Sequence, residues 1–298
     1  MEPSFGGRRY VIAEQPLGAR DYDIPVGWWG WNWEPPIPMS ITEIVRAGNM
    51  DTRTAALCGM AIEAHGSLLI AAEEPHSGKT TTLTALLDYL PHRVRRIFIR
   101  GWSETFDYLT QTTPDETLLL ANELSSHLPV YLWGPKAVRV FDTLRKGYAL
   151  GSTLHADSAE EAVAQLTGEL GVPAADLGRV HLLMVMRIYG TSRGGHARRV
   201  VSLHRLGEQG GTVTLTPLVT HAAASDEFAH DEDAEAGLLA ELRREDAAAA
   251  RAALDRKVAA LDFLLRRGIF DIPEVRAAIA ADHGEKAPVV LRGDPVNG

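Results

Sequence analysis

The chain is 298 residues long, 45% of its residues are hydrophobic, 23% are charged, and its formal net charge is −9. This composition excludes a chain too polar to bury a core, and the length is enough for one large domain with or without appendages. The negative charge argues against direct binding of nucleic acid through an overall positive field.

The single cysteine, Cys58, lies in an apolar stretch and cannot form an internal disulfide, which fits a reducing compartment. No apolar run is long enough to span a membrane, and the first residues lack the apolar core of a signal peptide. We therefore expect a cytoplasmic protein with no membrane span.

Residues 1–38 are predicted to form an N-terminal arm, because their richness in Gly, Pro and Trp opposes regular structure. The centre of this arm carries four tryptophans, Trp28, Trp29, Trp31 and Trp33. Their apolar area should not stay in water. Two interpretations stay open: the arm docks on a partner or neighbouring subunit, or it folds over its own domain.

Residues 39–222 form the predicted core, in which strands and helices alternate. The first helical stretch begins at Ser40 with a capping box to Glu43 and breaks at Gly48. Further helices are predicted at residues 82–87, 113–126, 137–146 and 158–170. Strands are predicted at residues 67–72, 93–100, 129–133, 148–154, 180–188 and 198–204. This alternation predicts an α/β fold with a mostly parallel sheet and helices on both faces.

Residues 223–298 are acidic and rich in alanine. We interpret residues 225–233 as a solvated linker. Four apolar residues beyond it recur at helical spacing and would form one face of a helix: Leu254, Val258, Leu261 and Leu265. This part is predicted to be a small helical C-terminal appendage, whose apolar stripe serves packing rather than cofactor binding.

Residues 73–81 read Glu-Glu-Pro-His-Ser-Gly-Lys-Thr-Thr and lie between a predicted strand and a predicted helix, which is the order of a phosphate-binding loop. In such a loop, backbone N–H groups and the helix N-terminus surround phosphates, a lysine adds positive charge, and the next hydroxyl holds Mg²⁺. Five residues supply these parts and predict a site for ATP and Mg²⁺, with Thr80 at the metal: Ser77, Gly78, Lys79, Thr80 and Thr81.

The match to this motif is incomplete. The motif has glycine at position 73, where this chain has Glu73, and His76 stands where a second glycine is common. A carboxylate at Glu73 or Glu74 also places negative charge beside the site of a polyanion. We therefore expect weak nucleotide binding or none. The alternative is a Gly-Lys-Thr sequence that simply opens an ordinary helix.

A second motif, Ser-Thr-Leu-His-Ala-Asp-Ser at residues 152–158, resembles the histidine box of the type II/type IV secretion ATPases. Residues 41–70 resemble the helices and strand before that family's phosphate loop, and residues 190–204 resemble its hairpin after the core. Residues 264–271 resemble the C-terminal end of some archaeal-type members. The resemblance covers roughly residues 39–215 and implies a divergent member with a RecA-like P-loop NTPase core.

The resemblance implies roles for individual residues. Lys79 and Thr80 fall on the positions that bind phosphate and Mg²⁺, and His155 falls on the histidine that senses the γ-phosphate. The alternative for His155 is an ordinary, satisfied histidine at a strand end.

The acidic positions of the family match less well. Its Asp box would fall on residues 100–104, where only Glu104 keeps a carboxylate, and its Walker B strand near residues 130–134, where there is no acid. Hydrolysis of ATP needs a carboxylate to orient water and an acid to hold Mg²⁺ through its waters. We therefore expect the Walker B acid and the Asp box to be lost. Glu104 is the first candidate to replace the missing catalytic carboxylate, and His155 is the other predicted catalytic residue. Glu123 lies in the predicted helix at residues 113–126, so we expect a surface residue.

Members of this family are hexameric ATPases that drive pilus assembly, protein secretion or conjugative transfer, so the resemblance implies two hypotheses. In the first, the chain binds ATP, hydrolyses it weakly, and works in a hexameric ring of its own copies or in a hetero-ring with an active homologue. In the second, it is a catalytically dead pseudo-ATPase that acts as a structural or regulatory subunit. Either form would reach the inner face of the membrane through inner-membrane secretion or pilus platform proteins. A phosphotransferase is a weaker alternative, because nothing in the sequence marks an acceptor site.

Overall fold

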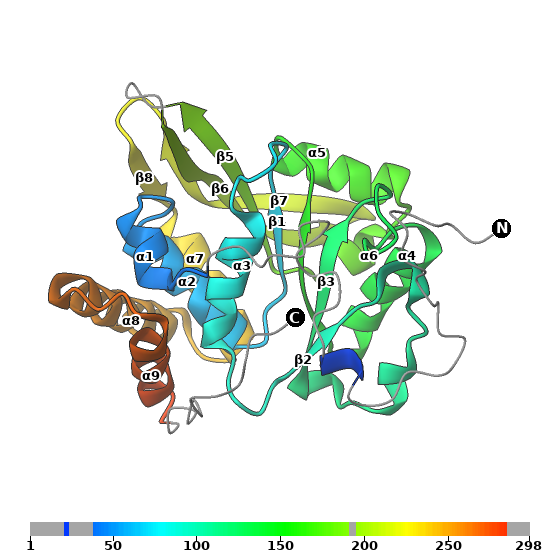
Figure 1. Ribbon diagram of the computed structural model, residues 1–298, viewed down its shortest axis with the longest axis horizontal. Helices are drawn as coiled ribbons and strands as arrows, with labels where there is room; N and C mark the ends of the chain where they lie inside the picture. The colour runs from blue at the N-terminus through cyan, green and yellow to red at the C-terminus, as the bar shows by residue number, and fades with distance from the viewer. Residues whose placement is uncertain (1–20, 24–37, 191–194, 285–298) are drawn as a thin grey trace, which may run out of the picture.

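The computed structural model describes residues 21–23, 38–190 and 195–284 (Figure 1). Most of the predicted N-terminal arm, including its tryptophans, lies outside these residues. The described part of the arm, Asp21–Asp23, is a single 3-10 turn (η1) whose Tyr22 side chain is buried. The Tyr22 hydroxyl donates a hydrogen bond to Glu104 Oε1 at 2.8 Å, so this short piece packs on its own domain.

In the described part of the chain, eight strands form one sheet in the order β2-β3-β4-β1-β5-β6-β7-β8. The first five strands in that order are parallel to one another: β2 (Arg95–Phe98), β3 (Thr117–Leu124), β4 (Ala149–Leu154), β1 (Leu68–Ala71) and β5 (Leu182–Gly190). The last three are antiparallel to their neighbours: β6 (His196–Gln209), β7 (Thr212–Ala222) and β8 (Glu227–His230). The predicted α/β class with a mostly parallel sheet is confirmed.

Helices cover both faces of this sheet (Figure 1). One face carries α1 (Ile41–Arg46), α2 (Thr52–Glu63), α3 (Lys79–Leu86), α7 (Glu232–Arg243), α8 (Ala247–Arg267) and α9 (Ile272–Asp282). The other face carries α4 (Gly134–Thr143), α5 (Ala159–Ala164) and α6 (Ala174–Leu177). Single-turn helices connect these elements: η2 (Leu87–Tyr89), η3 (Gly101–Ser103), η4 (Asp107–Thr110), η5 (Pro114–Glu116), η6 (Leu144–Lys146) and the π-type η7 (Gln165–Glu169).

The alternation of side chains along each strand builds two hydrophobic cores. In β1, Leu68 and Ile70 join the core under α1–α3 and the C-terminal helices, whereas Leu69 and Ala71 join the core under α4–α6. Because both faces are covered, every residue of β1, β3 and β4 is buried, and β1 is a continuous apolar run. The phosphate-loop strand β1 therefore lies at the centre of the sheet, with a helical layer on each side.

The structure corrects the prediction for residues 113–133. The predicted helix at 113–126 is wrong: after the turn η5, residues Thr117–Leu124 form strand β3. The predicted strand at 129–133 is also wrong, because this segment makes only an isolated bridge between Leu124 and Leu132 before α4 begins. A short apolar run can be a buried strand or a buried helix, and hydrophobic periodicity alone does not distinguish them.

The structure also corrects the predicted linker at residues 225–233. These residues form the turn between β7 and β8, the strand β8, and the start of α7. The C-terminal helices α7, α8 and α9 then pack into the same core as α1, α2 and α3. The helical character predicted for this region is present, but in the described residues no solvated linker separates it from the sheet.

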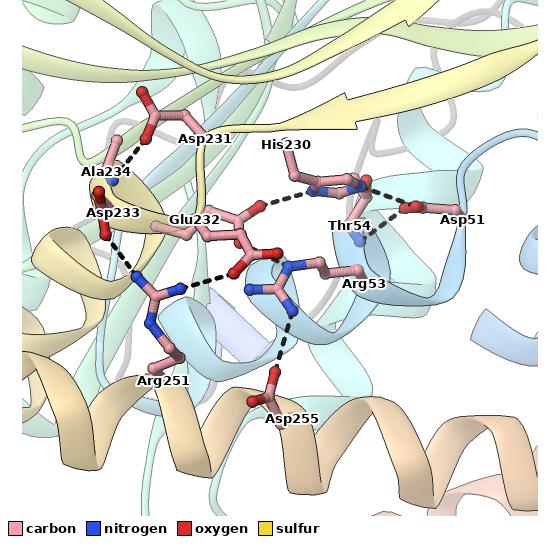
Figure 2. A network of polar contacts seen from close by, with 11 residues as sticks. Asp51, Arg53, Thr54, His230, Asp231, Glu232, Asp233, Ala234, Arg251 and Asp255 are labelled. Carbon is pink, nitrogen blue, oxygen red and sulfur yellow. Dashed lines mark hydrogen bonds and ion pairs between the residues drawn. The ribbon is translucent and has the colours of Figure 1, made fainter.

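A network of charged side chains joins α7 and α8 to the start of α2 (Figure 2). Arg53 on α2 donates to Glu235 on α7 at 2.7 Å and to Asp255 on α8 at 3.0 Å. The ring of His230, at the end of β8, lies between Glu235 Oε1 and Oδ2 of Asp51, the N-cap residue of α2. This network fixes α7 and α8 against the start of α2.

Candidate functional site

The predicted phosphate loop connects the end of β1 to the start of α3. Gly78 precedes the first residue of α3 and has a φ of +92°, a left-handed conformation that glycine adopts without strain. A β-carbon at this position would lie 3.2 Å from Arg198 Cδ, so the loop packs closely against β6 here. The predicted order of strand, loop and helix around residues 73–81 is confirmed.

The histidine that departs from the motif takes a conformation that glycine favours. His76 has a φ of +61°, which costs an L-residue about 1–2 kcal/mol. Its carbonyl oxygen accepts a hydrogen bond from Arg198 Nε at 2.8 Å. The loop therefore makes its turn with histidine in place of glycine and draws support from a neighbouring strand.

Lys79, the lysine of the loop, is only 8% exposed. Its Nζ donates a hydrogen bond to the carbonyl oxygen of Ala72 at 2.9 Å, at the end of β1. Burial lowers the pKa of Lys79, while the negative charges of Glu123, Glu73 and Glu74 act in the opposite direction. The ammonium group thus contacts one backbone carbonyl oxygen within the field of three glutamates, and negative charge on a ligand would compete with these glutamates.

Glu123 was predicted to lie in a helix, but in the structure it lies in strand β3. It is the residue before the last in β3, it is 8% exposed, and its backbone carbonyl accepts from Leu132 N at 2.8 Å. Because β4 lies between β1 and β3 and all three strands are parallel, their carboxyl ends share one edge of the sheet. Glu123 therefore lies at the edge of the sheet where the phosphate loop begins, and the expectation that it is a surface residue is wrong. The loss of the Walker B acid stays a prediction.

His155 follows β4 at the same edge and bridges the loop and this carboxylate. Its Nδ1 lies 2.9 Å from the carbonyl oxygen of Glu73, and its Nε2 lies 3.2 Å from Glu123 Oε1. The second contact is an ion pair without good hydrogen-bond alignment, and Glu123 Oε1 has no hydrogen-bond partner among the described residues. Interaction with Glu123 raises the pKa of His155 against the effect of burial. With an oxygen at each ring nitrogen, the imidazolium form fits this position.

The hydroxyl groups of the loop flank Lys79. Ser77 is buried, and its Oγ has no hydrogen-bond partner within the described residues. Thr80 and Thr81 are partly exposed in the first turn of α3. Thr80 keeps the position that holds Mg²⁺ in phosphate loops, and this role stays a prediction.

Glu104, the predicted replacement for the missing acid, has a different set of partners. It is 2% exposed, and Oε1 accepts hydrogen bonds from the Tyr22 hydroxyl at 2.8 Å and from Phe106 N at 2.6 Å. Its Oε2 accepts from Arg100 N at 2.9 Å. Both oxygens thus hold the loop after β2 together, and the catalytic role of Glu104 stays a prediction that Glu123 is better placed to fill.

The residues at this edge fit a magnesium nucleotide as a set. In the described ranges, no group of three or more His, Cys, Asp or Glu side chains is arranged to hold a metal ion alone. Mg²⁺ needs no such group, because it is bound through one or two protein oxygens, substrate phosphates and several waters. The buried Ser77 Oγ has no hydrogen-bond partner within the described residues, and Glu123 Oε1 contacts the His155 ring at 3.2 Å without good hydrogen-bond alignment, so both oxygens keep capacity for a polar ligand or water.

Comparison with known proteins gives distant similarities. No family model matches the chain. An uncharacterized protein of Methanocaldococcus jannaschii, MJ0900, is 25% identical over 197 aligned residues, which cover 57% of this chain and 34% of that protein. The chain thus spans about a third of the length of this curated relative.

Two solved structures are similar at low TM-scores. The ATPase DotB of Legionella pneumophila is 12% identical with a TM-score of 0.36, over 76% of this chain and 60% of that chain. The VirB11 ATPase of the Brucella suis type IV secretion system, in complex with sulphate, is 17% identical with a TM-score of 0.37, over 68% of this chain and 66% of that chain. Less than two thirds of each of these chains is therefore covered.

Proposed function

We propose that this chain binds ATP with Mg²⁺ at residues 73–81 and hydrolyses it, with Glu123 as the carboxylate that orients the attacking water. The observation that carries the proposal is the buried Oε1 of Glu123, which has no hydrogen-bond partner in the described residues and lies at the sheet edge where the phosphate loop begins. Its contact with the His155 ring at 3.2 Å leaves the rest of its hydrogen-bonding capacity for a ligand or water.

The binding part of the proposal uses the loop itself. Backbone N–H groups and the start of α3 surround the phosphates, Lys79 neutralises their charge, and the Thr80 hydroxyl and Glu123 hold Mg²⁺ directly or through its waters. Bound Mg²⁺ would withdraw negative charge from the phosphate oxygens and so make the γ-phosphorus easier for water to attack. Ser77 offers a further hydroxyl to a phosphate oxygen.

The catalytic part uses Glu123 and His155. Glu123 would accept a proton from the attacking water, and His155, whose Nε2 lies 3.2 Å from Glu123 Oε1, holds this carboxylate in place. His155 also contacts the carbonyl oxygen of Glu73 at 2.9 Å, so it links the loop to the carboxylate. A change in the loop when phosphate enters is thereby passed to the residue that orients water.

The cellular role follows from the sequence resemblance alone. The histidine box and the phosphate loop support a part in a secretion, pilus-assembly or conjugative-transfer machine, as a subunit of a ring in the cytoplasm. In the residues that the structure describes, no helix combines the length and the apolar character needed to cross a bilayer. The ring size and the platform proteins of such a machine belong to the proposal.

A second candidate is a nucleotide-sensing subunit without hydrolysis. It is favoured by Glu73 and Glu74, whose charges act on Lys79, and by the hydrogen bond that already occupies Lys79 Nζ. Such a subunit would bind Mg-ATP, but it would release no phosphate.

A calorimetric titration with Mg-ATP tests the binding part. We expect one site per chain in the wild type and in Glu123→Gln, because the amide keeps the shape of the side chain and an oxygen for the waters of Mg²⁺, while it loses the charge and the ability to accept the proton. Absence of binding in the wild type would overturn the proposal. Binding without phosphate release by the wild type would replace it with the second candidate.

A further inference from the structure

The hairpin of β5 and β6 extends beyond the end of β1 and lies against the phosphate loop. Only residues 182–185 of β5 pair with β1, while residues 186–190 continue past it and pair with β6 (Figure 1). Arg198 lies in this extended part of β6. Its Nε donates to the carbonyl oxygen of His76 at 2.8 Å, and its Cδ is 3.2 Å from where a β-carbon on Gly78 would lie.

We propose that Arg198 is a positioning residue that holds the phosphate loop in its turned conformation by fixing His76, and that Asp226 and Arg199 hold Arg198 in place. The proposal rests on the proposed function only for its nucleotide readout. Arg198 acts here through the loop and is given no contact with the reacting atoms.

The need for such a residue comes from His76. Phosphate loops place glycine at turns of positive φ, because glycine has no β-carbon to clash, whereas a histidine there is strained and tends to leave the conformation. His76 has a φ of +61°. A hydrogen bond from a charged guanidinium is stronger than one between neutral groups, so the bond from Arg198 offsets this strain.

Arg198 is itself fixed by a second layer on the neighbouring hairpin. Arg199 Nη1 donates to the carbonyl oxygen of Arg198 at 2.9 Å. The same guanidinium forms a two-pronged ion pair with Asp226, with Nε to Oδ1 at 2.7 Å and Nη2 to Oδ2 at 2.8 Å. His221 Nε2 lies 2.8 Å from Asp226 Oδ1, which orients that carboxylate.

This second layer also reaches the turn between α1 and α2. A β-carbon on Gly48 would lie 3.2 Å from the Arg199 guanidinium, so this turn leaves the guanidinium little room to move. The turn between β7 and β8, which carries Asp226, is thus connected to the phosphate loop through the Arg199 side chain, the Arg198 carbonyl oxygen and the Arg198 side chain. A fixed Arg198 backbone reduces the freedom that the side chain loses when it holds His76.

A double-mutant cycle with Arg198→Ala and His76→Gly tests the proposal. The first readout is hydrogen exchange of the backbone amides in residues 73–80 of the nucleotide-free protein, and the second is the Kd for Mg-ATP. In the wild-type background we expect Arg198→Ala to raise the exchange rate of these amides and the Kd for Mg-ATP by about tenfold or more. This factor corresponds to the loss of one charge-assisted hydrogen bond. In the His76→Gly background the same substitution should raise the exchange rate and the Kd by less than about threefold, because glycine adopts the turn without a supporting hydrogen bond.

Further variants separate this role from general stability. Arg198→Lys should protect these amides from exchange better than Arg198→Ala does. Asp226→Asn should raise the exchange rate and the Kd, but by less than Arg198→Ala. Arg205→Ala is the matched control on β6, because Arg205 pairs with Glu241 on α7 and not with the loop. It should leave exchange in residues 73–80 unchanged.

Two results would overturn the proposal. One is an unchanged exchange rate in Arg198→Ala. The other is an equal effect of Arg198→Ala on the exchange rate in the wild-type and His76→Gly backgrounds. If the wild type binds no nucleotide, the proposed function fails, and the exchange measurement still decides the role of Arg198.

Discussion

His230 should make the stability of this protein depend on pH in the alkaline range. Its Nε2 lies 2.8 Å from Asp51 Oδ2 and its Nδ1 lies 2.6 Å from Glu235 Oε1 (Figure 2). Both ring nitrogens therefore face carboxylate oxygens and both carry hydrogen. Burial disfavours the charged ring, but the hydrogen bonds and charges of Asp51 and Glu235 outweigh this effect and raise the pKa of His230 to about 9.

The sign of the effect follows from this raised pKa. In the unfolded chain a histidine titrates near 6.5, so the folded state binds the proton more tightly. The stabilisation is complete below about pH 6.5 and is lost as pH rises through about 9. The interval between the two pKa values corresponds to about 3 kcal/mol in the free energy of unfolding. The His230 ring is 11% exposed, so water screens part of this interaction, and we expect about 2 kcal/mol.

Urea unfolding of the wild type and His230→Gln at pH 6 and pH 9.5 measures this contribution. Glutamine can donate to one carboxylate and carries no charge, so the variant should be less stable at pH 6. The gap between the two proteins should shrink by about 2 kcal/mol at pH 9.5. The exposed His196 on β6 provides the control, and His196→Gln should show the same small gap at both pH values. A gap for His230→Gln that does not change with pH would refute the reasoning.

Two further predictions concern the loop lysine and the packing behind it. Lys79→Ala should abolish binding of Mg-ATP in the calorimetric titration, because the loop then presents Glu73 and Glu74 to the phosphates without the opposing cation; an unchanged Kd would contradict the site assignment. Gly59→Ala in α2 should lower the free energy of unfolding by about 1–3 kcal/mol, since the added β-carbon would lie 2.8 Å from the Tyr89 ring and the core must move to admit it. Urea unfolding checks this change, and a loss below about 0.5 kcal/mol would contradict it.

The sequence was sufficient where local pattern and chemistry coincide. The apolar run at residues 67–72 followed by Gly-Lys-Thr predicts a strand, loop and helix, and the structure has β1, the loop and α3 in these places. The strand that ends before His155 was predicted at residues 148–154 and is β4. Each of these elements carries a turn residue and a motif within a few positions, so little beyond the local sequence is needed.

The position of Glu123 was not accessible in this way. The run Leu118-Leu119-Leu120-Ala121 fits a buried strand and a buried helix equally, and Pro114 with its acidic neighbours favoured a helix start. The turn that follows Pro114 is indeed helical, but it ends after three residues. Placing Glu123 beside the loop also requires the insertion of β4 between β1 and β3, and strand order is a property of the whole sheet.

The contacts of Arg198 and His230 were missed for a related reason. Both residues were read as parts of their own local segments, a strand and an acidic stretch. Their partners lie 122 and 179 positions away, at His76 and Asp51. No periodicity or spacing in the chain encodes such pairs, and only the packing of the hairpins on the domain brings them together.

The release of phosphate from Mg-ATP by the wild type and by Glu123→Gln is the most direct test of the function proposed here. We expect slow but measurable release by the wild type and a loss of about 100-fold or more in Glu123→Gln, with binding retained. Glu104→Gln is the matched control and should keep the wild-type rate per folded molecule, because its oxygens accept from Tyr22, Arg100 and Phe106. Equal release by the wild type and Glu123→Gln, or a loss confined to Glu104→Gln, would contradict the account.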